Sequence, residues 1–578
     1  MNLRTYIPIL DWLPGYGKKE WKGDVSAGLT VGVMLIPQGM AYAMIAGLPP
    51  IFGLYASIFP LILYAIFGTS RQLAVGPVAM VALLVAAGVG ELADNQAQPE
   101  LYISLAILLA LMVGILQLSL GIFRLGFLVN FLSHPVISGF TSAAALIIGM
   151  SQFKHLLGIN LGGSNYIHEV LIEALRRIGE LSVPTLLIGL GGIALILLTR
   201  RYAKAIPGPL VAVVFGILAV WLGGLGESVK IVGQVPSGLP AFALPMMDFA
   251  AIKSLLPIAL TIALVGFMES IAVAKAIQAR HKNYKVVANQ ELIGLGMANI
   301  GGAFFQAFPT TGGFSRTAVN DQAGAQTGMA SIISATLIAL TLLFLTPLFY
   351  YLPQAVLASV IMVAVFGLID YREAIHLWHS KRDDFLMLLA TFGATLSLGI
   401  EEGILTGVVL SLAMVIYRSS YPHIAVLGRV PETTQYRNVD RFSDVEVRED
   451  TLIVRMDAQF YFANVQFFKS RLDEWIAQKG GKLKYLIIHA STINSIDSTA
   501  MHALEEWVNE YRQQGIELFF TNLKGPVRDA LQRSKLIDKI GKDHFFLRVH
   551  DAVSYLSGEA GTHNIEGYDK RTLQANTD

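Results

Sequence analysis

Long apolar runs, interrupted at short intervals by glycine, proline and charged residues, fill the chain from about residue 24 to residue 417. A helix that crosses a bilayer needs roughly 20 mostly apolar residues. The pattern therefore predicts an α-helical polytopic membrane protein. The predicted spans are 25–46, 51–68, 73–90, 101–122, 124–154 (broken at Pro135), 182–199, 206–224, 253–278, 286–305, 309–323, 327–349, 353–369, 383–399 and 401–418, which makes fourteen. Glycine and proline interrupt 73–90 and 309–323 most strongly.

Basic residues between the spans gather on one side. If the N-terminus lies inside, the inner loops hold Arg71, Arg124, Arg200, Arg201, Lys204, Arg280, Lys282, Lys285, Arg372, Lys381, Arg382 and Arg418. The outer loops hold Glu91, Asp94, Glu100, Glu227, Asp248, Glu401 and Glu402, and only the 154–180 loop mixes in Lys154, Arg176 and Arg177. Because cytoplasmic loops carry the excess of Lys and Arg, this pattern predicts an even number of spans with both termini in the cytoplasm.

The pattern changes after Arg418. Three short apolar runs, TLIVRMD, LKYLIIHAS and IELFFTNL, alternate with helix-like stretches, which predicts a small α/β domain. The first residues are broken by Pro and Gly and contain no compact apolar run, so we interpret them as a cytoplasmic start and not a signal peptide. The predicted parts are an N-terminal segment 1–22, a membrane domain 23–420, a polar linker 421–450, an α/β domain 451–557 and a disordered tail 558–578.

Composition agrees with a membrane protein. Hydrophobic residues make up 54% of the 578 residues and charged residues only 15%, whereas soluble domains carry about 25% charged residues. The net charge of +1 gives no electrostatic support for a nucleic-acid partner. The absence of cysteine excludes disulfides, thiolate metal sites and a cysteine nucleophile.

No motif for energy conversion or catalysis is present. The segment GYGKKE at 15–20 lacks the spacing of a phosphate-binding P-loop and no strand precedes it. His376 and His379 lie in a basic inner loop without a third ligand nearby, so a solvated pair is favoured over a metal site. We therefore expect no cofactor, no metal and no enzyme activity, and a secondary transporter or channel is indicated.

Two interrupted spans predict a substrate site. Secondary transporters often place the starts of discontinuous helices, from matching positions of two inverted repeats, at the middle of the membrane. The matching segments here are QLAVGPVAMVALL (72–84) and AFPTTGGFSRTAV (307–319), with helix starts expected near Pro77 and Phe314. Gly76, Gly312 and Gly313 allow the backbone to approach an ion closely. A helix start offers unpaired N–H groups and positive partial charge, so two of them predict an anion site. Packing glycines and proline kinks are the alternative, and the paired occurrence favours function.

Arg316 lies in the first turn of the second half-helix, beside Ser315 and Thr317, whose hydroxyls can donate to an anion. A charge within a span is costly and is a functional-site hypothesis by default. The alternative is an arginine that extends to the membrane interface, and the half-helix position argues against it. Arg316 is therefore predicted to be the fixed positive charge of the site.

Three further polar residues lie within spans. Burial of Glu269 would favour its neutral carboxyl, which suits it to bind and release a proton, whereas a structural pairing with Lys275 is an equal alternative. Gln38 and Tyr42 follow Pro37 four residues apart, hence on one helix face. They either complete a binding pocket or form a satisfied polar pair inside the bundle.

These motifs resemble a known family. LIPQGMAYAMIAGLPPIFGLYASIFP (35–60), FGTSRQLAVGP (67–77) and FPTTGGFSRTAVN (308–320) are similar to those of the SulP anion transporters, which include the sulfate permeases. The likeness runs from about Gly23 through the C-terminal domain. It implies seven-plus-seven inverted repeats that form core and gate domains, a C-terminal STAS domain and a homodimer.

The resemblance also implies a site. The family's anion lies between the third and tenth spans and is contacted by the first, which falls on Gln38, Tyr42, Val78, Ser315 and Arg316 in this chain. Our candidate substrate-binding set adds Gly76 and Thr317. Proton-coupled members carry a glutamate in the eighth span where this chain has Glu269, which weighs against sodium coupling.

The C-terminal domain matches STAS domains at SIDSTAMHAL (495–504). Regulatory relatives are phosphorylated on the serine after the aspartate, which falls on Ser498. Asp497 or Ser498 can instead cap the helix that begins there. We favour the cap.

The leading hypothesis is a proton-coupled sulfate symporter of the bacterial inner membrane, which works by elevator-like movement of the core against the gate. Alternatives are a bicarbonate, chloride or dicarboxylate transporter or exchanger, and a membrane sensor that signals through the STAS domain. The expected partners are a small anion, a proton, lipid, a second copy of the chain and a regulatory partner of the STAS domain.

Overall fold

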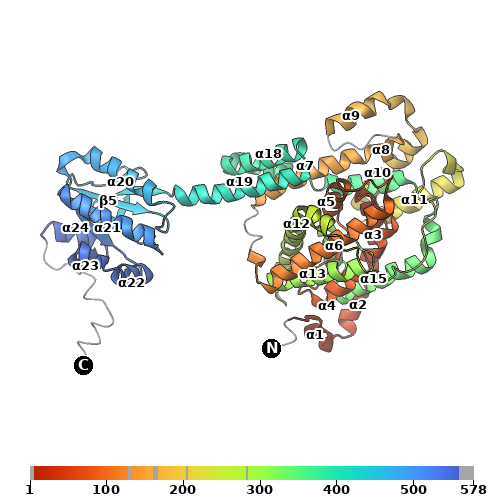
Figure 1. Ribbon diagram of the computed structural model, residues 1–578, viewed down its shortest axis with the longest axis horizontal. Coiled ribbons are helices and arrows are strands. Elements are labelled where there is room, and N and C mark those ends of the chain that lie inside the picture. Colours follow the sequence, from red (N-terminus) through yellow and green to blue (C-terminus); the bar gives the residue numbers. More distant parts are fainter. Residues whose placement is uncertain (1–5, 128–132, 160–166, 204–205, 282–283, 559–578) are drawn as a thin grey trace. The chain divides into compact units, whose positions relative to one another are not determined.

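The structure, a computed structural model, describes residues 6–127, 133–159, 167–203, 206–281 and 284–558. Two compact units are present, Met1–Ser411 and Leu412–Asp578. The first is almost entirely helical, and the second, blue in Figure 1, contains a sheet with helices.

The first unit contains two very short strands, β1 (Val75–Gly76) and β2 (Thr311–Gly312), and nineteen α-helices counting α19, which runs past Ser411, among the described residues. The helices are α1 (Ile9–Trp12), α2 (Lys18–Ile45), α3 (Ile51–Tyr55), α4 (Phe59–Phe67), α5 (Ala79–Gly90), α6 (Pro99–Ile122), α7 (His134–Ser151), α8 (Phe153–Leu157), α9 (Ile167–Arg176), α10 (Val183–Tyr202), α11 (Gly208–Gly223), α12 (Phe249–His281), α13 (Ala288–Phe304), α14 (Phe314–Gln322), α15 (Met329–Leu340), α16 (Gln354–Phe366), α17 (Tyr371–Ser380), α18 (Arg382–Ser397) and α19 (Ile400–Ser420).

Apart from 124–154, each predicted span coincides with a helix, with successive helical segments, or with a short strand followed by a helix. Seven helical stretches are long and apolar enough to cross a bilayer, judged by length and composition in the described part of the chain. Four apolar helices are shorter: Ile51–Phe67, Ala79–Gly90, Gly208–Gly223 and Leu405–Ser420. The span predicted over 51–68 is built from two short helices, and the interrupted spans 73–90 and 309–323 each consist of a short strand followed by a helix.

The span predicted over 124–154 differs in the structure. Helix α7 begins only at His134, with Pro135 in its first turn. A proline is accommodated there because its missing N–H would have no helical acceptor. Pro135 therefore starts the helix and does not break it, and residues 128–132 lie outside the described residues. Helix α17, in a predicted inner loop, was not expected; Asp370 caps it by accepting from Glu373 N–H at 3.1 Å.

Helices of the first unit approach closely where glycines face one another. Helix α6 packs along α13, and an added Cβ at Gly114 would lie 2.6 Å from the backbone nitrogen of Ile300. A Cβ at Gly296 would lie 2.6 Å from the backbone nitrogen of Leu118. Small residues that let backbones approach are typical of helix contacts in membranes. This packing supports α12, which also lies against α6.

The second unit is an α/β domain. Its strands are β3 (Ile424–Arg429), β4 (Tyr436–Asn438), β5 (Thr451–Met456), β6 (Tyr485–His489), β7 (Glu517–Thr521) and β8 (Phe545–Phe546), in the order β4-β3-β5-β6-β7-β8. Strands β5 to β8 are parallel, and β3 is antiparallel to both neighbours. The helices are α20 (Val465–Lys479), α21 (Ser498–Gln513), α22 (Gly525–Arg533), α23 (Leu536–Ile540) and α24 (Val549–Leu556).

Both faces of this sheet are covered. Leu452 and Val454 of β5 pack in one core with residues of α20 to α23, whereas the intervening Ile453 packs in a second core with α24. Successive strand residues point to opposite faces, so a sheet buried on both faces has nearly continuous apolar strands. This is the apolar-run pattern that predicted the domain.

The predicted linker 421–450 is corrected by the structure. Residues 424–429 and 436–438 within it form β3 and β4 and complete the sheet. Ala425 and Leu427 alternate into the core beneath α24, a pattern too short to stand out among polar residues. Of the predicted tail 558–578, residues 559–578 lie outside the described residues.

Candidate functional site

Two half-helices begin beside each other in the first unit. Strands β1 and β2 pair antiparallel, with Val75 opposite Gly312 and Gly76 opposite Thr311. Helix α5 starts two residues after β1 and α14 starts one residue after β2, close to the starts predicted at Pro77 and Phe314. The first N–H groups of a helix have no acceptor within it, so both helix starts present donors and positive partial charge.

The crossing of the two segments is held by hydrogen bonds between parts far apart in sequence. Gly313 N–H donates to Ala74 O at 3.0 Å, and Ala74 N–H donates to Thr317 Oγ1 at 3.1 Å. From α12, Ser270 Oγ accepts from Gly312 N–H at 2.8 Å and lies 2.8 Å from Thr311 Oγ1. The two half-helix starts are therefore parts of one hydrogen-bonded assembly with α12.

Arg316 lies in the first turn of α14 and is 2% exposed. Its Nη1 donates at 2.5 Å to Pro77 O, in the two-residue segment between β1 and α5. Its Nε and Nη2 are buried and have no hydrogen-bond partner among the described residues. A buried guanidinium with unused donors is costly unless an anion or carboxylate compensates it. The side chain therefore has two donor nitrogens without a protein partner at the crossing of the helix starts.

Polar residues of α2 and α12 lie within electrostatic reach of this guanidinium. Tyr42 and Glu269 both interact electrostatically with Arg316. Gln38 and Tyr42 are 4% and 5% exposed, and α2 packs against both α5 and α14. In the described part of the chain, Gln38 Oε1 and Glu269 Oε2 are buried without a hydrogen-bond partner. The structure thus brings Tyr42, Glu269 and Arg316 together from three elements, and Gln38 lies one helical turn before Tyr42 on α2.

The other predicted residues are placed differently. Gly76 faces the site, because an added Cβ would lie 3.5 Å from Arg316 Nη2. Val78 is the residue before α5 and is half-buried, whereas Ser315 is exposed in the first turn of α14. The hydroxyl of Thr317 donates its single proton to Gly313 O at 2.7 Å. Its predicted donation to an anion is therefore replaced here by a structural role, since that proton is already used.

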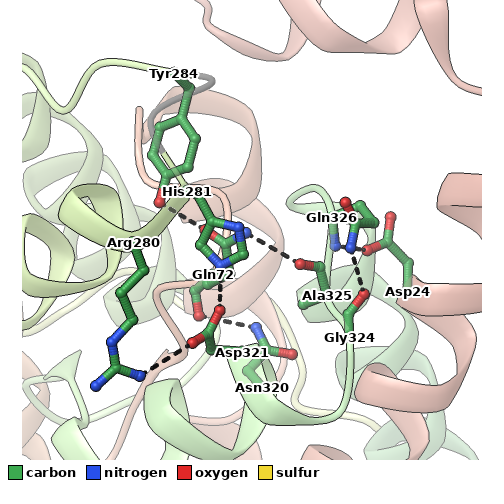
Figure 2. Close-up of polar contacts among 10 residues, drawn as sticks. All are labelled: Asp24, Gln72, Arg280, His281, Tyr284, Asn320, Asp321, Gly324, Ala325 and Gln326. Carbon is green, nitrogen blue, oxygen red and sulfur yellow. Dashed lines mark hydrogen bonds and ion pairs between the residues drawn. The ribbon is translucent and has the colours of Figure 1, made fainter.

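The far end of α14 is tied to three other segments, as Figure 2 shows. The side chain of Gln72, just before β1, donates to Ala325 O at 3.0 Å and accepts from Tyr284 OH at 2.6 Å. Its backbone oxygen accepts from Asn320 Nδ2 at 2.8 Å. Gln72 therefore links the segment before β1 with the C-terminal end of α14, with the loop that follows α14 and with the chain after α12.

Asp321, next in α14, binds the end of α12. It pairs with Arg280 at 3.5 Å and forms a hydrogen bond with His281 (Figure 2). On the other side, Asp24 of α2 is fully buried and accepts from Gln326 N–H at 2.7 Å. These contacts join α2, α12 and α14, and they were not predicted from the sequence.

Glu291 was also missed. This residue of α13 is fully buried and accepts from Tyr64 OH at 2.5 Å and from Thr69 N–H at 2.7 Å. A charged residue inside the predicted span 286–305 was the available signal, by the rule that singled out Glu269. Unlike Glu269, it is fully hydrogen-bonded, which indicates a structural role.

Asp497 caps α21 in the second unit by accepting from Ala500 N–H at 2.8 Å. Ser498 is the first residue of that helix and is exposed. The cap favoured from the sequence is therefore present and belongs to Asp497. Phosphorylation of Ser498 stays a prediction.

We expect Gly313→Ala to weaken sulfate binding by about tenfold, the loss of roughly one hydrogen bond to a charged group. The backbone at Gly313 suits any residue, but the new Cβ would lie 2.7 Å from Arg316 Cζ and Nη2 and would displace the guanidinium. Gly90→Ala in α5 is the control, because no atom lies within 4 Å of its added Cβ. Calorimetric titration of both variants with sulfate measures the effect. Equal affinity in the two variants would contradict the placement of Arg316.

Comparison with known proteins identifies the family. The model of the sulfate permease family matches residues 21–391, and the STAS domain model matches residues 443–552. The chain belongs to the sulfate permease family. This confirms the family and the STAS domain predicted from the motifs.

Relatives of this family member match along nearly the whole chain. It is 42% identical to "Sulfate transporter 4.1, chloroplastic" of Arabidopsis thaliana, covering 97% of this chain and 84% of the relative. It is 34% identical to "High affinity sulfate transporter 2" of Stylosanthes hamata, covering 96% and 87%. These relatives are named as transporters, which agrees with the prediction that the chain is not an enzyme.

A solved structure shares the fold. The murine Solute Carrier 26 family member A9 (Slc26a9) anion transporter in the inward-facing state superposes with a TM-score of 0.89, at 26% identity, over 96% of this chain and 95% of that one. The chain is therefore a helical membrane transporter for anions with a C-terminal STAS domain.

Proposed function

We propose that this permease is a proton-coupled sulfate symporter. The observation that carries the proposal is the buried guanidinium of Arg316, with two unused donors, between two helix starts and within electrostatic reach of Glu269. The helix starts and the guanidinium suit a small oxyanion. The names of the relatives, as sulfate transporters, support sulfate as that oxyanion.

Counting charge supports a role for the proton. Arg316 contributes +1, ionised Glu269 contributes −1, and each helix start contributes roughly +0.5, so the empty site carries about +1. Sulfate, at −2, would leave about −1 unless Glu269 takes up one proton. An uncompensated charge in low-dielectric surroundings is expensive. We infer that sulfate is loaded together with a proton on Glu269, whereas a monovalent anion can be loaded without one.

We further propose that the hydrogen-bonded assembly of β1, α5, β2, α14 and α12 moves as one body against the remaining helices and carries the anion in an elevator-like step. The bonds through Gln72 and Asp321 support this, because they would keep the two helix starts together during movement. We also propose that the protein is a homodimer in a bacterial inner membrane, with both termini in the cytoplasm. The distribution of basic loops supports this orientation.

Uptake of labelled sulfate by the purified protein in sealed liposomes tests the function. We expect saturable uptake that accelerates when the exterior is made acidic and does not respond to a sodium gradient. A panel of bicarbonate, chloride and dicarboxylates, added as competitors, measures selectivity. Uptake indifferent to pH, or absent with sulfate and present with another anion, would contradict the proposal.

Ending the chain after Arg418, which removes the α/β domain and the segment before it, should leave equilibrium sulfate binding unchanged. All candidate substrate and proton residues precede residue 320 and make their described contacts inside the first unit. Binding to the purified, monodisperse truncated protein is compared with binding to the full chain. A truncated protein that stays folded but no longer binds sulfate would show that the site depends on the STAS domain.

A further inference from the structure

A cleft lies at the end of the first unit away from the contacts of Figure 2. Helix α14 runs from the helix-start crossing to those contacts, whereas α5 runs from the crossing to the loop that contains Gln96. The cleft at the α5 end has two adjoining parts, of about 320 and 270 Å³. Both parts are lined by Gln96, Lys154, His155 and Gln354.

Two lysines face this cleft. Lys154, in α8, lines both parts and Lys230 lines the smaller one, and the two ammonium groups interact electrostatically. Among the described residues that line either part, none is Asp or Glu. Two ammonium groups that line one concave surface focus a positive potential there, which attracts small anions.

The backbone holds these groups in place. Gln354 N–H donates to Lys230 O at 2.9 Å, and Val232 N–H donates to Leu352 O at 2.8 Å, so the Lys230 segment is paired with the start of α16. Gln354 is the first residue of α16, a helix of thirteen residues whose start adds positive partial charge at the cleft. Asn95 and Gly47 line the larger part, and Asn95 Nδ2 donates to Gly47 O at 3.3 Å. The cleft is therefore a built, cationic surface.

The positions of these lysines run against the charge distribution of the loops. Lys154 was one of the few basic residues on the predicted outer side, where acidic residues dominate. Basic residues on that side oppose the usual orientation signal. A role in collecting an anion gives them a physical reason to be there.

We infer that the cleft lined by Lys154, Lys230 and Gln354 is an outer binding site for small oxyanions, which collects the transported anion before it reaches Arg316. The identity of the anion and the outward orientation rest on the proposed function. The cationic cleft itself does not.

Initial rates of sulfate uptake by the full-length protein in phosphatidylcholine liposomes test the inference. We expect Lys154→Gln/Lys230→Gln to raise the KM for external sulfate about tenfold at low salt, as the loss of electrostatic attraction predicts, with the maximal rate unchanged. High salt should remove the difference, and Lys154→Arg/Lys230→Arg should behave as wild type. Lys253→Gln removes an exposed lysine at the start of α12 that does not line the cleft, and it is the matched control.

Labelling of a single cysteine tests occupancy without transport. The chain has no cysteine, so Gln96→Cys places one thiol in the lining of both parts of the cleft. Sulfate should slow its reaction with a neutral, membrane-impermeant maleimide in a saturable way, compared with chloride at equal ionic strength. In the Lys154→Gln/Lys230→Gln background this protection should disappear.

In the uptake experiment, the inference is overturned if the KM of Lys154→Gln/Lys230→Gln stays at the wild-type value, if its maximal rate falls in proportion, or if Lys253→Gln has the same effect. In the labelling experiment, it is overturned if sulfate does not protect the thiol of Gln96→Cys. An effect that appears only when anionic lipid is added would assign the lysines to a lipid headgroup instead. A wild-type protein that transports no sulfate, yet shows sulfate protection through both lysines, would reject the proposed function and keep the outer site.

Discussion

Replacement of Arg316 by alanine should abolish saturable sulfate binding, with affinity lowered by at least about 100-fold, because truncating one partner of a buried charge pair costs several kcal/mol. The guanidinium is the buried cation at the crossing of the two helix starts, and two of its nitrogens have no protein partner in the described chain. What remains in the variant is the partial charge of the helix starts. Calorimetric titration with sulfate measures the loss.

The variant should remain folded. Two buried donor nitrogens of Arg316 have no hydrogen-bond partner in the described chain, which costs free energy, so without sulfate Arg316→Ala should unfold at the same temperature as the wild type or higher. Sulfate should raise the unfolding temperature of the wild type but not of the variant, since a ligand stabilises only the state it binds. Arg316→Lys keeps the charge but loses the planar pair of donors, so intermediate affinity is expected. Arg200→Ala, at an exposed position, is the control. Wild-type affinity in Arg316→Ala would remove this residue from the site.

Replacement of Glu269 by glutamine should uncouple sulfate uptake from the proton gradient. Glutamine resembles the protonated carboxyl, so the loaded site stays near neutral and sulfate still binds. Uptake by the wild type should accelerate when the exterior is acidic, and uptake by the variant should not. The measurement is labelled sulfate uptake into liposomes with an acidic or a neutral exterior.

Glu291→Gln is the matched control for this experiment. Glu291 is also a buried carboxylate, but Tyr64, Thr69 and Ser70 already donate to it. Its replacement should lower the thermal stability, because the backbone N–H groups of Thr69 and Ser70 both donate to Oε1, which an amide satisfies less well than a carboxylate. The dependence of uptake on pH should persist in this control. A Glu269→Gln protein driven as strongly by the gradient as the wild type would exclude Glu269 from coupling.

Most helices of the first unit could be predicted from the sequence, because an apolar run long enough to cross a bilayer directly indicates a membrane-spanning helix. The starts of α5 and α14 were predicted within two residues from Pro77 and the glycines before Phe314. The pairing of Val75 with Gly312 could not be predicted, since it joins segments more than 200 residues apart. The structural role of Thr317 was missed for the same reason. Its hydroxyl accepts from Ala74 N–H and donates to Gly313 O, and these two residues are brought together only by the pairing of β1 with β2.

The hydrogen bonds and the ion pair made by Gln72, Asp321 and Asp24 could not be predicted from the sequence, for a related reason. Asp24 and Gln72 directly precede predicted spans, a position that sequence alone assigns to a solvated loop, and Asp321 lies near the end of the predicted span 309–323. Only the packing of α2, α12 and α14 shows their partners. Gln72 and Asp24 bond to the loop after α14, and Asp321 pairs with the end of α12 (Figure 2). Strands β3 and β4 were missed because their short apolar alternation lies among polar residues.

The position of a bound oxyanion tests the central claim most directly. A structure of the protein with selenate, a sulfate mimic whose selenium can be located by anomalous scattering, would place the anion. Binding of selenate to the same sample is first confirmed by titration. We predict a selenium peak between the starts of α5 and α14, with its oxygens within hydrogen-bonding distance of the Arg316 guanidinium. A selenate ion bound elsewhere, with the space beside Arg316 empty, would contradict the claim that this crossing is the substrate site.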